Sequence, residues 1–172
     1  MRNNLLFTAT ALLLVLLNGF FVAAEFAIVK LRRTQADELA KPHGLRGRVL
    51  RTVRSNLDAY LSACQLGITL ASLGLGWIGE PAFARLIEPA LEFAGITEPR
   101  LVHSIAFAFA FGLISFLHIV IGELAPKSLA IRRAEPVSLN TALPLYVFYW
   151  AMYPFIRVLN GAANMILRRL GV

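Results

Sequence analysis

The chain has 172 residues, of which 58% are hydrophobic and only 16% are charged, and its mean hydropathy is +0.66. This composition excludes an ordinary water-soluble domain and intrinsic disorder. A disulfide scaffold is excluded too, because the single cysteine, Cys64, has no partner within the chain. The apolar residues lie in blocks of about 20, the length that a helix needs to cross a bilayer. We therefore expect an all-α integral membrane protein.

The positive charge is unevenly placed along the chain. The formal net charge is +7, and residues 30–54 hold eight of the 17 Lys and Arg residues, directly after the first apolar block. That placement is typical of a cytoplasmic loop beside anionic lipid head groups. We expect the lipid bilayer, and no nucleic acid, as the partner of this basic stretch.

Three apolar blocks predict membrane helices, at Leu5–Val29, Leu57–Gly79 and Leu101–Gly122. A cleaved signal peptide is the alternative for the first block, but its apolar run is long and its strong positive charge follows rather than precedes it. Glu80 and Pro81 are expected to end the second helix. Residues 80–100 are then expected to form a short helix at the outer interface.

The last block, Leu143–Ile156, is short for a span and contains two prolines and many aromatic residues. We expect a re-entrant or in-plane segment here, with a fourth span as the alternative. The positions of the basic residues then place the N-terminus outside and the C-terminus in the cytoplasm of the plasma (inner) membrane.

Two carboxylates lie near the ends of predicted membrane helices, Glu25 in the first and Glu123 at the end of the third, and each needs a partner, a proton or an ion in lipid. Both lie near the cytoplasmic ends of helices that run in the same direction. The second helix carries Ser62, Gln65, Thr69 and Ser72 on one face, because their spacings are three, four and three. Further polar residues at similar depth are Asn18 in the first helix, and Ser115 and His118 on one face of the third.

Carboxylate, hydroxyl and amide oxygens suit a hard cation such as Mg²⁺ or Na⁺, so we interpret this region as a candidate cation pocket. Each residue also has a structural alternative. Glu25 can pair with Lys30 or Arg32, His118 can make an interhelical hydrogen bond, and Ser and Thr can bond their own backbone. Glu123 is the strongest candidate, because Gly122 and Pro126 around it predict a helix break that frees backbone carbonyls.

Small residues form two ridges on the second helix. Ala63, Gly67 and Ala71 are spaced by four, as are Ser72 and Gly76. Either ridge can serve close packing within one subunit or contact across a homodimer seam.

Three segments, NGFFVAAEFAIVKLRR at 18–33, NLDAYLSACQLGITLASLGLGWIGEP at 56–81 and HIVIGELAPKSLAI at 118–131, resemble the membrane domain of the CorC/cyclin M (CNNM, HlyC/CorC) family of magnesium transporters. The resemblance covers essentially the whole chain, as one transmembrane domain over residues 1–172. It implies a homodimer with three membrane helices and a cytoplasmic juxtamembrane helix, exporting Mg²⁺ in exchange for Na⁺. It also implies cytosolic CBS-type and transporter-associated domains in a full-length chain, and these lie outside the present sequence.

The family's ion-coordinating glutamate falls on Glu123. Other family ligands do not transfer, since Val22 stands where many members have a serine, and Ile68 and Ser72 stand where some have asparagines. Members with the FFVAAE and QLGIT pattern form a subgroup of the family. The oxygens that we expect to replace the missing ligands are those of Gln65, Thr69, Ser72, Glu25 and Asn18.

The leading hypothesis is therefore a secondary transporter module for divalent cations, with Na⁺-coupled Mg²⁺ export from the cytoplasm. A membrane anchor and dimerisation platform for cytosolic regulatory domains is the alternative. We expect no enzyme, because no nucleophile–base arrangement, phosphate loop or zinc motif occurs along the chain.

Overall fold

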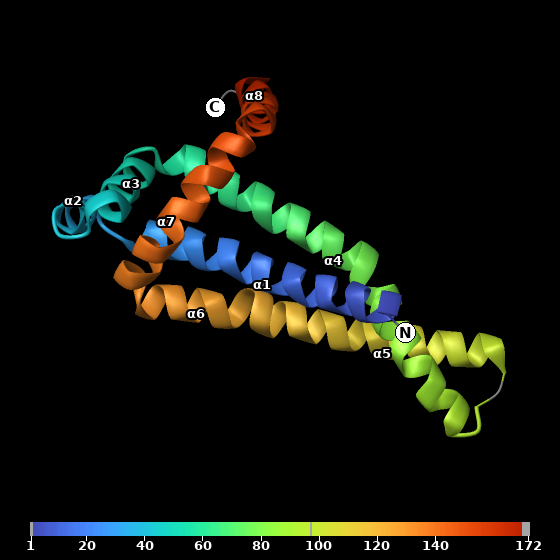
Figure 1. Ribbon diagram of the computed structural model, residues 1–172. Helices are drawn as coiled ribbons and strands as arrows, with labels where there is room; N and C mark the ends of the chain where they lie inside the picture. Colours follow the sequence, from blue (N-terminus) through green and yellow to red (C-terminus); the bar gives the residue numbers. More distant parts are fainter. Residues whose placement is uncertain (1, 97, 170–172) are drawn as a thin grey trace. The chain divides into compact units, whose positions relative to one another are not determined.

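A computed structural model of the protein describes residues 2–96 and 98–169, with side chains from Asn4 onward, and contains no strand within them (Figure 1). The all-α prediction is therefore confirmed. In chain order, the elements are α1 (Arg2–Lys30), α2 (Arg33–Ala40), α3 (Gly44–Ser55), α4 (Leu57–Phe93), α5 (Pro99–Leu117), the π-helix η1 (His118–Leu124), α6 (Ala125–Arg132), α7 (Ala134–Ala151) and α8 (Tyr153–Arg169).

Three helical stretches of the described chain are long and apolar enough to cross a membrane, which confirms the three predicted spans. They cover Asn4–Lys30, Leu57–Phe93 and Pro99–Arg132. Helices α7 and α8 meet at a bend of 79°, as a broken span or a re-entrant loop would (Figure 1). Both readings of the last apolar block, in-plane or re-entrant segment and fourth span, therefore stay open.

The predicted end of the second helix at Glu80 and Pro81 is wrong, because α4 continues through Pro81 and Pro89 to Phe93. A proline withdraws a single N–H from a helix, and membrane helices tolerate that loss. The helix is terminated just after Phe93 by Gly95, whose φ of 89° suits a residue without a Cβ. Ile96 N donates to Leu91 O at 3.1 Å, which closes the last turn as in a Schellman motif.

The predicted break in the third helix, around Gly122 and Pro126, is also wrong, because the helix continues through this segment. Helix α5 passes directly into η1 and then into α6, so that one candidate span runs from Pro99 to Arg132. The backbone widens into a π-helix, rather than breaking, around Gly122 and ahead of Pro126. Such π segments inside α-helices are frequent at functional sites.

The chain divides into two compact units, and the first comprises Met1–Phe20 and Ile68–Pro126. Its core joins α1, α4 and α5 through small side chains: Ala11, Ala106 and Ala110 are fully buried. Small residues let helix backbones approach closely in lipid, where no hydrophobic effect drives association. The other members of this core are Val15, Leu75, Phe83, Ala84 and Ile114.

The second unit comprises Phe21–Gly67 and Lys127–Val172. Phe21 of α1 packs on Gly67 of α4, where an added Cβ would lie 2.5 Å from the ring, and its ring centroid lies 4.7 Å from that of Phe148. Tyr60 packs on Tyr149 at 4.6 Å between ring centroids. Some of the aromatic side chains of α7 therefore pack against α1 and α4.

The basic loop of the second unit folds into α2 and α3. Leu50 and Val53 of α3 are fully buried, while the Arg54 side chain turns back to the end of α1. Arg54 Nε donates to Leu31 O at 2.7 Å. This bond satisfies one of the carbonyls that the C-terminal end of a helix leaves without a helical donor.

The two predicted ridges of small residues have different surroundings. Ala63 is fully buried and Gly67 contacts Phe21, so the first ridge packs within the chain. Gly76, in the second ridge, has open space where a side chain would lie. A homodimer seam along the second ridge stays a prediction.

Candidate functional site

Helix α1 and the π-helix η1 approach each other closely in the first unit. A Cβ on Gly19 would lie 3.0 Å from Pro126 Cγ and 3.1 Å from Ile121 O. A Cβ on Gly122 would lie 3.4 Å from Val15 O. The two glycines thus allow contact between α1 and the segment that carries GELAP.

Pro126 explains the hydrogen bond at this contact. It has no N–H, so the carbonyl four residues earlier, that of Gly122, lacks its α-helical donor. Asn18 Nδ2 donates to Gly122 O at 2.9 Å, and the Asn18 side chain is 2% exposed. The prediction that Pro126 frees a carbonyl is therefore confirmed, and an amide from another helix satisfies it.

A chain of hydrogen bonds continues from Asn18 to α4 and back to η1. The Ser72 hydroxyl donates to Asn18 Oδ1 at 3.2 Å, and His118 Nε2 lies 3.3 Å from Ser72 Oγ. Because a carbonyl cannot donate, Gly122 O fixes the Asn18 amide with its nitrogen toward η1. The Ser72 hydroxyl then donates its one proton to Asn18 Oδ1, so Ser72 Oγ can only accept from His118. We therefore assign the Nε2–H tautomer to His118.

This polar cluster of Asn18, Ser72 and His118 keeps some capacity to bind a cation. Asn18 Oδ1 and Ser72 Oγ each have two lone pairs, and each uses one in the chain of hydrogen bonds. Two neutral oxygens therefore remain for a hard cation. Mg²⁺ prefers six oxygen ligands in octahedral geometry, so further oxygens from water or other side chains are needed.

The cluster borders a cavity of about 260 Å³ between α4 and the α5–η1 helix. Ser72, Ser115 and His118 line it, which confirms that Ser115 and His118 share one face. Glu80, two turns beyond Ser72 on α4, also lines it. The remaining walls are apolar or aromatic, formed by Leu75, Gly76, Phe107, Phe111 and Ile114.

Glu123 follows Gly122 in η1, and its side chain is exposed. Within the described part of the chain it makes no hydrogen bond and no ion pair. Counting back from Arg132 at the end of the span, Glu123 lies about 13 Å along the helix axis. The carboxylate thus lies near the end of the candidate span, and among the described residues it has no hydrogen-bond or ion-pair partner.

The other predicted ligands fall into both units. Thr69 belongs to the first unit with Asn18, Ser72 and Glu123, while Glu25 and Gln65 belong to the second. The structure brings Asn18 and Ser72 together, as predicted. Among residues 2–96 and 98–169, no three His, Cys, Asp or Glu side chains gather as a metal centre would require.

Two structural alternatives have different outcomes. Glu25 is half-buried, and its predicted ion pair with Lys30 or Arg32 is wrong, since the ion pair found in the described residues joins His103 to Glu88. The hydroxyl of Ser62, by contrast, donates to the backbone carbonyl of Asp58 at 3.0 Å. Ser62 therefore bonds its own helix, as we considered for this class of residue.

Sequence reasoning found the three residues of the polar cluster but missed two polar groups beside it, the carbonyl of Gly122 and the carboxylate of Glu80. It did not include the carbonyl of Gly122 by name, although the G-E-L-A-P spacing contains that information through Pro126. It also placed Glu80 at the outer interface, because it took Glu80 and Pro81 as the end of the second helix. His118 was expected to make an interhelical bond, and this expectation is confirmed.

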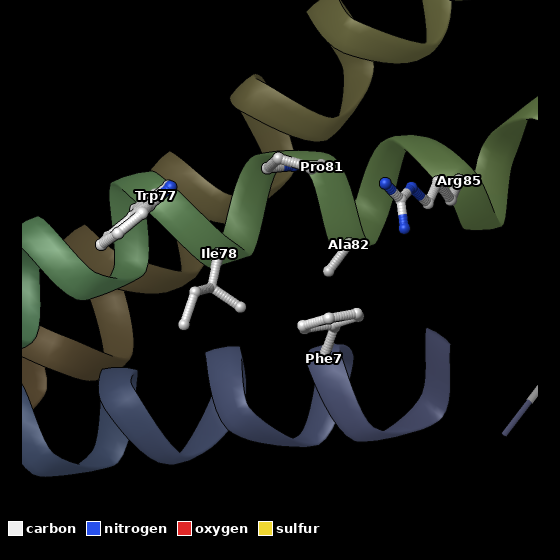
Figure 2. A pocket seen from close by; sticks show the side chains of 6 residues that line it. All are labelled: Phe7, Trp77, Ile78, Pro81, Ala82 and Arg85. Atoms are coloured by element: carbon white, nitrogen blue, oxygen red, sulfur yellow. The ribbon is translucent and has the colours of Figure 1, made fainter. Parts of the chain in front are cut away.

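A second cavity of the first unit, of about 310 Å³, is lined by Phe7 of α1 and by α4 residues. Figure 2 shows Phe7, Ile78 and Ala82 pointing into the space between the two helices. Arg85 is the cation that lines it, and Trp77 is 84% exposed. The walls of this cavity are mainly apolar.

Three apolar spans and a polar cluster inside them define a multi-pass membrane protein. The profile of the Cyclin M transmembrane N-terminal domain matches residues 9–172. The chain therefore belongs to the CNNM family, as its resemblance to the CorC/cyclin M proteins indicated. It is a membrane module of this Mg²⁺-transport-associated family, whose membrane domains are generally transporter or regulatory modules rather than enzymes.

Relatives include UPF0053 proteins of Bacillus subtilis (strain 168). The chain is 50% identical to YhdT over 159 residues, which cover 92% of this chain and 34% of YhdT. It is 44% identical to YrkA over 171 residues, covering 99% of this chain and 38% of YrkA. In Mycobacterium tuberculosis (strain ATCC 25618 / H37Rv), the uncharacterized protein Rv1841c is 35% identical over 162 residues, covering 94% of this chain and 46% of Rv1841c. The chain thus spans less than half the length of these relatives.

Proposed function

We propose that this domain is the membrane part of a secondary transporter that exports Mg²⁺ from the cytoplasm in exchange for Na⁺. The observation that carries the proposal is the unpaired carboxylate of Glu123 on a π-helix inside an apolar span. A charged side chain costs about 2.5–3.5 kcal/mol on insertion scales at the centre of a membrane helix, and less toward the cytoplasmic end, where Glu123 lies. A transient cation is one way to offset that cost, and it gives the carboxylate a function.

Neutral oxygens near η1 support the same proposal. Asn18 and Ser72 hold one another through a 3.2 Å hydrogen bond and keep one lone pair each. Within the first unit, we assign Glu123 the essential negative charge, and Asn18, Ser72 and Thr69 neutral oxygens. One carboxylate among neutral ligands would bind Mg²⁺ weakly, as suits an exporter that loads from abundant cytosolic Mg²⁺.

Transport by the full-length protein tests the proposal. In proteoliposomes with a Na⁺ gradient and a Mg²⁺-sensitive dye, we expect Glu123→Gln to abolish Na⁺-dependent Mg²⁺ flux, because the amide keeps the shape and removes the charge. Glu92→Gln is the matched control, since Glu92 is exposed at the end of α4 and outside the polar cluster. Its flux should equal that of the wild type.

The competing hypothesis, a homodimeric anchor for cytosolic regulatory domains, predicts another result. If Glu123→Gln transports as well as Glu92→Gln, transport through this site is refuted. Size-exclusion chromatography and thermal unfolding of both variants separate loss of transport from loss of the folded oligomer.

A further inference from the structure

A large basic cavity lies in the second unit. Its volume is about 600 Å³, and its walls come from the end of α1, the start of α2, the end of α6 and the start of α7. Four cationic side chains line it: Lys30, Arg32, Arg132 and Arg133. Two come from residues 30–33 and two from residues 132–133, so the fold brings together charges a hundred residues apart.

Among the described residues, these cations have no ion-pair partner. The one acidic residue lining the cavity, Glu135, accepts a hydrogen bond from Gln35 Nε2 at 3.2 Å. In the part of the chain that the structure describes, none of the four cations forms an ion pair. Four like charges around one space repel each other, and an anion within the cavity would relieve that repulsion.

The position of the cavity along the spans indicates the source of the anion. Lys30 is the last residue of the first candidate span, and Arg132 is the last residue of the third. Both candidate spans therefore end at the cavity, on the side that faces the phosphates of one leaflet. Basic pockets between membrane helices on the cytoplasmic side bind acidic lipid head groups, and the positive-inside rule places this end in the cytoplasm.

Two further features of the walls suit a phosphate ester. Helix α7 begins at Ala134, and its first residues line the cavity, so the partial positive charge of this helix end lies beside it. Ile131 supplies an apolar surface for the part of a lipid next to its head group. The cavity of Figure 2 offers a contrast within the same protein, because Arg85 is its one cation.

We propose that the cavity lined by Lys30, Arg32, Arg132 and Arg133 binds the phosphate group of an anionic phospholipid in the adjacent leaflet. The shared chemistry is a phosphate between several cations, which a free phosphate ion would also satisfy. The location at the ends of two spans favours the lipid. This inference does not depend on the transport proposal.

Native mass spectrometry of the full-length protein, released from nanodiscs of phosphatidylcholine and phosphatidylglycerol, tests the inference. We expect the wild type to retain phosphatidylglycerol, and Arg132→Gln/Arg133→Gln to lose retention by about fivefold for each arginine removed. The matched control is Arg85→Gln/Arg100→Gln, which removes the same charge elsewhere. Equal retention in wild type and the Arg132/Arg133 variant, or equal loss in both double variants, would overturn the proposal.

Two further arms separate the sources of the anion. Inorganic phosphate, added at constant ionic strength, should not displace the lipid; displacement at millimolar phosphate would assign the cavity to a soluble anion and overturn the lipid assignment. A photo-crosslinking residue at Ile131 should yield a lipid adduct. A crosslink to an acidic segment of the full-length chain would instead show that protein covers the cavity, and would also overturn the proposal.

Discussion

Asn18 and Gly122 lie 104 residues apart in the sequence, yet Asn18 Nδ2 donates to Gly122 O at 2.9 Å. The bond ties the first membrane helix to the π-helix of the third, at the carbonyl that Pro126 deprives of its helical donor. The same amide accepts from Ser72 and so reaches α4 as well. One side chain thus joins all three spans at the residue before Glu123.

Replacing Asn18 should weaken this joint. In Asn18→Leu, Gly122 O loses its donor and Ser72 loses its acceptor, and we expect the free energy of unfolding to fall by about 1 kcal/mol, a usual size for an interhelical bond in membranes. Thr10→Val is the control, because Thr10 is exposed and its hydroxyl bonds Leu6 O in its own helix. Chemical unfolding in detergent measures both. Equal stability of the two variants would contradict a structural role for Asn18.

Gly67 and Gly76 make a matched pair on α4. A Cβ at Gly67 would lie 2.5 Å from the Phe21 ring, which is buried and packs on Phe148, so Gly67→Ala should destabilise by about 1–3 kcal/mol. Gly76 has no atom within 4 Å of an added Cβ, and Gly76→Ala should leave stability unchanged or raise it by about 0.5–1 kcal/mol. Thermal unfolding of each variant provides the comparison. A more stable Gly67→Ala would show that the Phe21 contact is absent.

Arg54 should hold the basic loop in place. Its Nε donates to Leu31 O at 2.7 Å from a half-buried position, so Arg54→Gln should loosen α3 against the end of α1. Hydrogen exchange of residues 44–55 should speed up several-fold, as about 1 kcal/mol of lost stability implies. Arg51→Gln, an exposed neighbour on the same helix, should exchange like the wild type. Identical exchange in both variants would mean that the bond contributes nothing.

Cysteine labelling tests the orientation. Cys64 is fully buried and should resist a membrane-impermeant maleimide until the protein is denatured. In a Cys64→Ala background, Arg48→Cys should react only from the cytoplasmic side and Glu92→Cys only from outside, following the positive-inside rule. Both positions are exposed, so lack of access does not limit the reaction. The reverse pattern would invert the topology and the proposed direction of transport.

The spans were predictable because apolar length is a direct physical requirement of the bilayer. The ends of the helices were less predictable. Pro81 suggested an end to the second helix, but the chain turns only at Gly95, which has a positive φ. The sequence indicated which polar residues share a face, and therefore the meeting of Asn18 with Ser72. It could not indicate that η1 is a π-helix, since the hydrophobic period and residue propensities do not distinguish a π-turn from an α-turn within a helix.

The basic cavity was outside the reach of sequence reasoning for a related reason. The charge run at residues 30–54 was visible, and so were Arg132 and Arg133. Which of these cations face one common space depends on how α1, α2, α6 and α7 end and begin. Spacing along a chain gives the faces of one helix, and only tertiary structure gives the meeting of four helix termini.

The dependence of the third span on an amide from the first has a consequence for biogenesis. Entering the bilayer alone, the third span would lack the donor that Asn18 supplies to Gly122 O, and a carbonyl without a donor is costly in hydrocarbon. The ribosome makes α1 first, so its amide is already in the membrane when the later segment arrives. The donor, Asn18, is therefore made before the carbonyl of Gly122 that needs it.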